Sequence, residues 1–330
     1  MRKEEEHRRS ARVPRAASGF SHRKRVRSLR SSGVTYSGRM TSGPRRVGGA
    51  AAGRWPVDPN YWDPIAHQHE QPTPHCLLRV RRDIAELHTD PLPGVFVAPE
   101  ETDLTRIHAV LVGPTKTPYQ GGFFHFLLKC PPDYPMSPPR VRIMTTDGGR
   151  VMFNRHLYNN GKVCLSLLGT FLGSSWTPAQ TVGSVLLSVQ SIMTEDPFDD
   201  QCRVASVSLV ARGQHPLCAT RVTVLHETIR AAVCDVVEGC LRGNDPWPAS
   251  MREAVLGAFG DNYAHYEDAC KDNLAADGRE MAGTGTICPD GSKYGFGTLL
   301  ARLRSLKERV REEGSAAAAA AVATADAASD

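Results

Sequence analysis

The sequence predicts an α+β fold, in which a four-stranded antiparallel meander is flanked by helices and followed by a helical carboxy-terminal extension. Two observations carry this prediction. A segment with helical periodicity comes first, and four short strand-like runs then follow in succession, separated by glycine and proline residues. Strands that are consecutive along the chain pair through short connections, which favours an antiparallel sheet.

The first helix is expected to open at Pro74, because proline is favoured in the first turn of a helix. Apolar side chains then recur on one helical face, at Leu77, Val80, Ile84 and Leu87. The four predicted strands span residues 94–98, 106–112, 122–130 and 140–144. Glycine and proline punctuate the segments between them, as the turns of a meander require.

A second helix is predicted after Thr177 and Pro178, which form a suitable N-cap and first-turn pair. Its apolar residues recur at helical spacing, at Val182, Val185, Leu186, Val189, Ile192 and Met193. Three further amphipathic patterns follow, over residues 222–236, 255–270 and 299–310. The turn cluster 243–246 (GNDP) separates the first of these from the others, and the predicted extension begins there.

Composition divides the chain into five parts. Residues 1–54 contain 15 Lys and Arg against 3 Glu and few large apolar residues, which predicts a disordered basic arm. The arm carries +12 and the whole chain +5, so the remainder carries −7 and the basic character belongs to the arm. The other predicted parts are a linker over 55–73, the α+β core over 74–242, the helical extension over 243–313 and a disordered Ala-rich tail over 314–330.

Cysteine usage predicts the cellular compartment. The nine cysteines contain no close Cys-x-x-Cys repeat, and no apolar signal-peptide core follows the start, so a reducing compartment is expected. We therefore expect a cytoplasmic and nuclear localisation. The basic run 22–30 (HRKRVRSLR) is compatible with a nuclear-import signal, with nucleic-acid contact, or with a solvated charge run.

Several other classes of site are disfavoured. Residues 163–194 contain no charged side chain, but their glutamines, serines and glycines make them too polar for a membrane span, and no membrane association is expected. No cysteine or carboxylate set at zinc spacing accompanies His67, His69 and His75, so no metal is predicted. The chain also lacks a P-loop motif, which argues against direct nucleotide hydrolysis.

Three short segments resemble the ordered signatures of ubiquitin-conjugating enzymes. They are residues 131–139 (PPDYPMSPP), 160–165 (NGKVCL) and 176–179 (WTPA). Each alone is a weak signal, but all three occur in the family's order. Two later segments, 226–230 (HETIR) and 269–272 (ACKD), resemble the carboxy-terminal helical extension of the large Z-type subgroup. The resemblance implies that residues 74–242 form a ubiquitin-conjugating core.

The resemblance implies an acyltransferase in which Cys164 is the acceptor thiol. Cys164 would take ubiquitin as a thioester from an activating enzyme and pass it to a lysine amine, with ubiquitin ligases and substrate proteins as further partners. A thiol suits this chemistry because it is both a nucleophile and a leaving group. No cofactor would be bound, since the upstream activating enzyme consumes the ATP. The Z-type resemblance further implies the alternative activating enzyme and a ubiquitin-like modifier besides ubiquitin.

The resemblance also places a hydrogen-bond donor eight residues before the cysteine, where the family has the Asn of a His-Pro-Asn triplet. The aligned triplet here is Asn-Arg-His over 154–156, so every position departs from the family pattern. His156 is the candidate donor to the oxyanion that forms during aminolysis, through a ring N–H. Asn159 or Asn160 can substitute for the missing amide, and His156 can instead serve only to stabilise the loop.

Other site residues follow from the same alignment. Asp200 lies where the family has a paired-acid turn, and a carboxylate there would orient a neutral attacking amine. The alternative is a solvated turn at a helix end. Tyr158 is a candidate wall of the amine channel. On the first helix, Arg79, Arg81 and Arg82 resemble the surface that docks the activating enzyme, although a solvated helix face is the competing interpretation.

Two other functions compete with catalysis. The first is a catalytically impaired variant that binds ubiquitin without a covalent bond, because the triplet 154–156 departs from the family pattern. Retention of Cys164 in an otherwise intact loop favours the enzyme. The second is a nucleic-acid-associated protein that acts through the basic arm, and this is the least favoured of the three.

Overall fold

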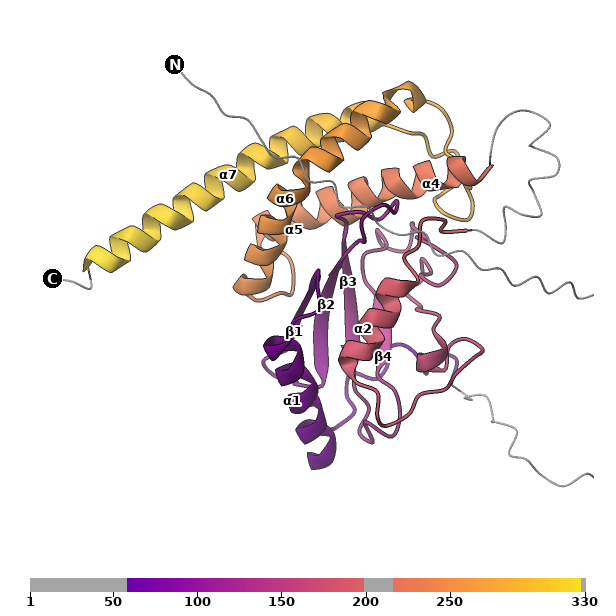
Figure 1. Cartoon of the computed structure of the whole chain (residues 1–330), viewed down its shortest axis with the longest axis vertical. Helices are drawn as coiled ribbons and strands as arrows, with labels where there is room; N and C mark the ends of the chain where they lie inside the picture. The colour runs from indigo at the N-terminus through magenta and orange to yellow at the C-terminus, as the bar shows by residue number, and fades with distance from the viewer. Residues whose placement is uncertain (1–57, 199–215, 328–330) are drawn as a thin grey trace, which may run out of the picture. The chain divides into compact units, whose positions relative to one another are not determined.

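The computed structural model describes residues 58–198 and 216–327, with side chains over 58–198 and 219–315 (Figure 1). The predicted basic arm lies outside the described residues. The first part contains α1 (Pro74–Thr89), β1 (Val95–Pro99), β2 (Arg106–Val112), β3 (Phe123–Lys129), β4 (Arg140–Ile143), η1 (Ser166–Leu168) and α2 (Val182–Ser191). The second contains α4 (Pro216–Glu227), η3 (Thr228–Asp235), α5 (Val236–Arg242), α6 (Ala249–Asn273), η4 (Leu274–Ala276) and α7 (Phe296–Ala327).

The predicted meander is confirmed. The strands pair in the order β1-β2-β3-β4, and every pair is antiparallel. Ala109 of β2 faces Phe126 of β3, which in turn faces Ile143 of β4. The strand ends agree with the predicted ends to within a residue because glycine and proline mark each turn.

The sheet is buried on both faces. In β2, Ala109 and Leu111 pack into the core that contains α1 and α2, whereas Val110 packs into a second core built by the carboxy-terminal helices. Phe124 and Phe123 of β3 divide between the two cores in the same way. Side chains alternate between the faces of a strand, so the helical extension covers the face opposite α1 and α2.

A buried carboxylate joins α1 to the start of α2. Asp83 of α1 is 1% exposed and accepts hydrogen bonds from Arg79 Nε at 2.7 Å, from the backbone N–H of Val182 at 3.1 Å and from the Tyr134 hydroxyl. Arg79 also donates to the carbonyls of Pro178 and Gln180, at 2.8 and 2.6 Å. This network fixes the backbone that enters α2.

The start of α2 differs from the prediction. The helix begins at Val182, and its N-cap is Thr181 rather than Thr177. Thr181 and Ser184 form a reciprocal capping box, which satisfies two backbone N–H groups at once. Thr177 instead opens a turn that Gln180 closes through both its backbone and its side chain.

The helical pattern before the turn cluster 243–246 is one continuous helical path, in which η3 is a π-helical segment between α4 and α5. Its buried residues belong to both cores, since Ala232 packs with α1 and α2 and Val233 with α6 and α7. From α6, the Tyr266 hydroxyl donates to the Gly121 carbonyl at 2.7 Å. Gly121 has φ +73°, and a Cβ there would meet the Tyr266 ring at 2.7 Å, so this contact requires glycine.

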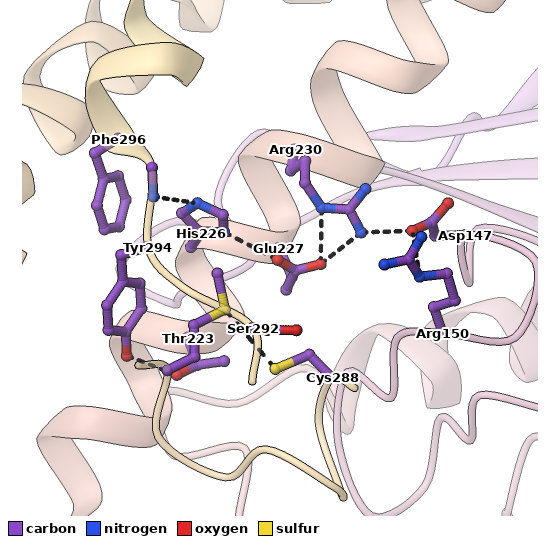
Figure 2. Close-up of polar contacts among 12 residues, drawn as sticks. Asp147, Arg150, Thr223, His226, Glu227, Arg230, Cys288, Ser292, Tyr294 and Phe296 are labelled. Atoms are coloured by element: carbon purple, nitrogen blue, oxygen red, sulfur yellow. Dashed lines mark hydrogen bonds and ion pairs between the residues drawn. The ribbon is translucent and has the colours of Figure 1, made fainter. Parts of the chain in front are cut away.

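A polar chain ties the extension to the core loop between β4 and the cysteine (Figure 2). Buried Glu227 binds His226 at 2.9 Å and Arg230 at 2.6 Å, and Arg230 continues to Asp147 at 2.8 Å. The backbone N–H of Gly295 donates to His226 Nε2 at 3.1 Å, so the neutral ring carries its proton on Nδ1. Burial acts to raise the pKa of Glu227, but the hydrogen bonds from His226 and Arg230 outweigh it and lower the pKa.

Two predicted segments differ from the structure. The Ala-rich tail is helical over its described part, since α7 continues to Ala327. Alanine has the highest helix propensity, so a run of alanines prolongs an existing helix. The predicted linker is packed over residues 58–73, which we call the strap, because Arg140 and Arg142 of β4 bind its carboxylates Glu70 and Asp63.

No described helix is long and apolar enough to span a membrane.

Candidate active site

Cys164 ends a loop, residues 154–164, that folds back on itself beside the sheet. Leu157 bridges to Val163, and the Cys164 N–H donates to the His156 carbonyl at 2.8 Å. The loop is joined to β4, since the Ile143 N–H donates to the Gly161 carbonyl at 2.9 Å. These backbone bonds place Cys164 directly opposite His156.

The tip of this loop is the turn that the sequence predicts. Asn160 Oδ1 accepts from the Lys162 N–H at 3.0 Å, and Gly161 has φ +94°. A Cβ on Gly161 would lie 2.7 Å from Arg142 Nε, so glycine is required for its conformation and for the close approach. Asn159 and Asn160 are exposed, and the Asn160 side chain is used in the turn.

Asn154 fixes the start of the loop from the interior. It is 1% exposed, and its Oδ1 accepts from the N–H groups of His156 and Leu157, at 2.8 and 2.9 Å. Its Nδ2 donates to the Tyr119 hydroxyl and the Ile192 carbonyl, each at 3.1 Å. Both groups of the side-chain amide make two hydrogen bonds within the chain, so Asn154 holds the backbone of His156 in place.

His156 contacts the cysteine through its ring as well as its backbone. Nδ1 lies 2.9 Å from the Cys164 carbonyl oxygen, which can only accept, so Nδ1 carries the proton. Nε2 therefore bears a proton only in the doubly protonated ring. The Phe171 ring packs edge-on against His156 at 5.3 Å between centroids and is 57% exposed. The structure thus gives His156 a loop-supporting contact, while the oxyanion role stays a prediction that needs the charged ring.

Thr170 holds the backbone on both sides of Cys164. Its hydroxyl donates to the Val163 carbonyl at 2.6 Å and accepts from the Leu165 N–H at 2.9 Å. Val163 and Leu165 are the two chain neighbours of Cys164. One side chain therefore holds the backbone on both sides of the thiol.

The thiol itself is buried beside one cation and one hydrogen-bond donor. Cys164 is 7% exposed, and burial raises its pKa. The Lys162 ammonium and a hydrogen bond from the Tyr158 hydroxyl act in the opposite direction, but burial outweighs them and the pKa of the thiol stays above its ordinary value. By contrast, burial raises the pKa of Cys234 and of Cys270 to about 12. A thiolate that forms at Cys164 has a cation and a hydrogen-bond donor beside it, and both stabilise its charge.

Tyr158 lies beside the thiol, its role as a wall of the amine channel stays a prediction, and its hydrogen bond to Cys164 predicts a pH effect. Tyr158→Phe removes a donor to the thiolate, so the pKa of Cys164 should rise and less thiolate should be present at neutral pH. We expect alkylation of Cys164, followed by mass spectrometry of its peptide, to slow roughly fivefold at pH 7, as for a hydrogen bond of about 1 kcal/mol. The difference should vanish at a pH above both pKa values. Tyr294→Phe removes a distant hydroxyl and should leave this profile unchanged.

The predicted acid Asp200 lies outside the described residues. The described part of the same turn contains Asp196, which with His156 and Thr194 lines a hollow of about 260 Å³ at the end of α2. Asp196 is exposed. The Asp196 carboxylate thus borders the same hollow as His156, whereas the sequence prediction had chosen Asp200.

The three arginines of α1 are not equivalent. Arg79 is engaged within the chain by Asp83 and two carbonyls, and it lies over the Tyr134 ring at 5.7 Å, so it is a structural residue rather than part of a free docking face. Arg81 and Arg82 are exposed. Trp176, from the third signature segment, donates its Nε1–H to the Pro135 carbonyl at 2.7 Å.

Two residues beside the cysteine were missed from the sequence. Tyr61 of the strap donates to the Gly169 carbonyl at 3.1 Å, and the pKa of its hydroxyl is raised by burial and then by nearby Cys164. Thr170 is the other. Neither belongs to a signature segment, and Tyr61 is more than a hundred positions from the loop it touches. In the described part of the chain, no group of three or more His, Cys, Asp and Glu side chains is placed to hold a metal.

Comparison with known proteins adds independent evidence. The family model of the ubiquitin-conjugating enzyme matches residues 79–221, which include the loop 154–164 and both flanking helices. The chain is 43% identical to ubiquitin-conjugating enzyme E2 Z of Homo sapiens over 261 residues, which cover 77% of this chain and 70% of that protein. It is 42% identical to the E2 Z protein of Xenopus tropicalis, over 76% of this chain and 78% of that protein.

The E2 Z protein of Danio rerio gives a similar result, with 41% identity over 76% of this chain and 75% of that protein. These alignments, of 258 to 261 residues, are longer than the match of the family model to residues 79–221. The antiparallel meander, the flanking helices and the loop that presents Cys164 agree with them. This chain belongs to the ubiquitin-conjugating enzyme family, a family of transferases, and is similar to its E2 Z members.

Proposed function

We propose that Cys164 accepts ubiquitin as a thioester from an activating enzyme and then transfers it to a lysine amine. The observation that carries this proposal is the setting of the thiol, held by Thr170 on one side and His156 on the other, with Lys162 beside it. In the first step the Cys164 thiolate attacks the activated carbonyl, and the thiolate of the activating enzyme leaves. ATP is spent upstream, and no cofactor takes part.

In the second step a neutral lysine amine attacks the thioester carbonyl, and Cys164 leaves as a thiolate. The amine gives up a proton to solvent water, and negative charge forms on the carbonyl oxygen before the C–S bond breaks. His156 in its doubly protonated form is the proposed donor to that oxygen. Asp200 is the proposed acid that orients the amine. Asn159 and Asn160 remain alternative donors, and both lie exposed at the tip of the loop.

The finer assignments rest on similarity to the E2 Z proteins. We propose that the alternative ubiquitin-activating enzyme loads this protein, with a ubiquitin-like modifier accepted besides ubiquitin. Arg81 and Arg82 on the exposed face of α1 are the proposed contacts for the activating enzyme. Ubiquitin ligases and substrate proteins complete the set of partners. The seven cysteines in the described part of the chain are all free thiols, which suits the proposed cytoplasmic and nuclear location.

The proposal is tested by loading. The purified full chain is mixed with ATP, tagged ubiquitin or ubiquitin-like modifier, and each of the two ubiquitin-activating enzymes in turn. We expect an adduct on a non-reducing gel that disappears when the sample is reduced, and it should form with the alternative activating enzyme. An absence of adduct with both enzymes, when a known conjugating enzyme loads in parallel, would leave noncovalent ubiquitin binding as the better function.

A substitution at His156 separates its two candidate roles. If its ring stabilises the oxyanion, His156→Ala should slow discharge onto free lysine by about tenfold or more, and should slow loading less. Single-turnover discharge of the preloaded enzyme measures this. Equal slowing of both steps would assign His156 to loop support alone.

A further inference from the structure

The strap, residues 58–73, is attached to the core by contacts that a simple linker does not make. Arg140 of β4 binds Glu70 with two hydrogen bonds, of 2.7 and 3.0 Å, and also donates to the Tyr61 carbonyl at 3.0 Å. Arg142 binds Asp63 at 2.5 Å, and its guanidinium lies 5.8 Å from the Trp62 ring centroid. Each of these arginines is at most about a quarter exposed, so the contacts are partly shielded from solvent.

These attachments bring Tyr61 to the segment that follows the thiol. η1 runs from Ser166 to Leu168 and ends at Gly169, which has φ +66°. The Tyr61 hydroxyl donates to the Gly169 carbonyl at 3.1 Å. Tyr61, Leu168 and Thr170 also border one cavity of about 520 Å³. The hydroxyl therefore fixes the peptide unit directly before Thr170.

Thr170 then passes this constraint to the thiol. Its hydroxyl donates to the Val163 carbonyl at 2.6 Å and accepts from the Leu165 N–H at 2.9 Å, and its own N–H donates to the Leu165 carbonyl at 3.2 Å. The backbone on both sides of Cys164 is thus held by one residue, whose preceding peptide is held by Tyr61. The path from the strap to Cys164 thus consists of the Tyr61–Gly169 hydrogen bond, the peptide bond from Gly169 to Thr170, and the Thr170 hydrogen bonds to Val163 and Leu165.

We propose that Tyr61 is a positioning residue for Cys164, acting through Gly169 and Thr170. The strap is then part of the active site, although it precedes the first helix of the core. The inference rests on the proposed role of Cys164 as the thioester residue. Without the Tyr61 hydroxyl, the segment 169–170 loses an anchor, and the thiolate moves relative to Lys162 and Tyr158. Both its reactivity and its rate of loading then fall.

The test uses Tyr61→Phe, Thr170→Val and the double variant in the full chain. Thr170→Ser, which keeps the hydroxyl, serves as the rescue variant, and Tyr294→Phe is the matched loss of a distant tyrosine hydroxyl. Two quantities are measured: the initial rate of loading from the activating enzyme, and the pH profile of Cys164 alkylation read by mass spectrometry of its peptide. The second needs no partner protein, so it tests positioning even if loading fails and the proposed function is wrong.

We expect Tyr61→Phe to slow loading and neutral-pH alkylation about fivefold, as the loss of one hydrogen bond of about 1 kcal/mol would. Thr170→Val should slow both at least as much, Thr170→Ser should restore them, and Tyr294→Phe should match the wild type. The double variant should be less than additive, because both residues act on one path. Wild-type loading and an unchanged alkylation profile in Tyr61→Phe would overturn the proposal, and so would strict additivity in the double variant.

Discussion

Cys164→Ala should abolish the reducible adduct completely, and Cys164→Ser should replace it with an adduct that survives reduction. Alanine offers no nucleophile. A serine hydroxyl in the same place would form an oxygen ester, which thiol reductants do not cleave and which transfers its acyl group to amines more slowly than a thioester. Reducing and non-reducing gels of the three proteins, loaded side by side, measure both effects.

The matched control for this change is Cys288→Ala. Cys288 is also buried and free, but it lies in the extension, where its sulfur contacts Met281. It should load like the wild type. If Cys164→Ala still gave a reducible adduct, the acceptor would be another of the nine thiols, and the assignment to position 164 would be wrong.

The sheet and most helices were predictable because their signals are local. Glycine and proline mark each turn of the meander, and Val182, Val185, Leu186 and Val189 recur at helical spacing, so the element types were right. The start of α2 was misplaced because Thr177-Pro178 satisfies the local rule for a helix start. The capping box of Thr181 and Ser184 lacks the acidic third residue that usually reveals one.

The strap was missed because its stability is not local. Its 16 residues are rich in Asp, His, Pro and Gln and show no periodicity, so composition alone indicates a linker. It is held by Arg140 and Arg142, which are distant in sequence and pair with Glu70 and Asp63 only in the folded chain. The same reason hid Tyr61 from the candidate site, although the position of Cys164 itself was available from its motif.

The roles within the triplet 154–156 could also not be read from the sequence alone. The family pattern drew attention to His156, while Asn154 seemed to be only a departure from that pattern. The structure shows Asn154 buried with four hydrogen bonds, two from each end of its amide. Burial and hydrogen-bond partners depend on Tyr119 and Ile192, which belong to distant segments. A motif locates a site in the sequence, whereas the role of each side chain depends on the residues that it contacts in the folded chain.

Asn154→Ala should therefore be the most damaging substitution in the loop that does not touch the thiol. It leaves the N–H groups of His156 and Leu157 without their acceptor and the Ile192 carbonyl without its donor, all in or near the interior. Each buried polar group left unpaired costs about 1 to 3 kcal/mol, so we expect a loss of about 3 kcal/mol in the free energy of unfolding. Urea or guanidinium titration monitored by tryptophan fluorescence measures it.

The same substitution should slow loading, because His156 and Cys164 are paired through their backbones and the loop can then shift as a unit. Asn160→Ala is the matched control in the same loop: Asn160 is exposed and makes one turn hydrogen bond, so its stability loss should stay within about 1 kcal/mol. Asn154→Asp keeps the acceptor for both N–H groups but places a carboxylate oxygen against the Ile192 carbonyl. Asn154→Asp should therefore be nearly as unstable as Asn154→Ala. A stability close to that of the wild type would show that the amide N–H groups of Asn154 are dispensable. Equal losses in Asn154→Ala and Asn160→Ala would show that the buried amide is not what holds the loop to the core.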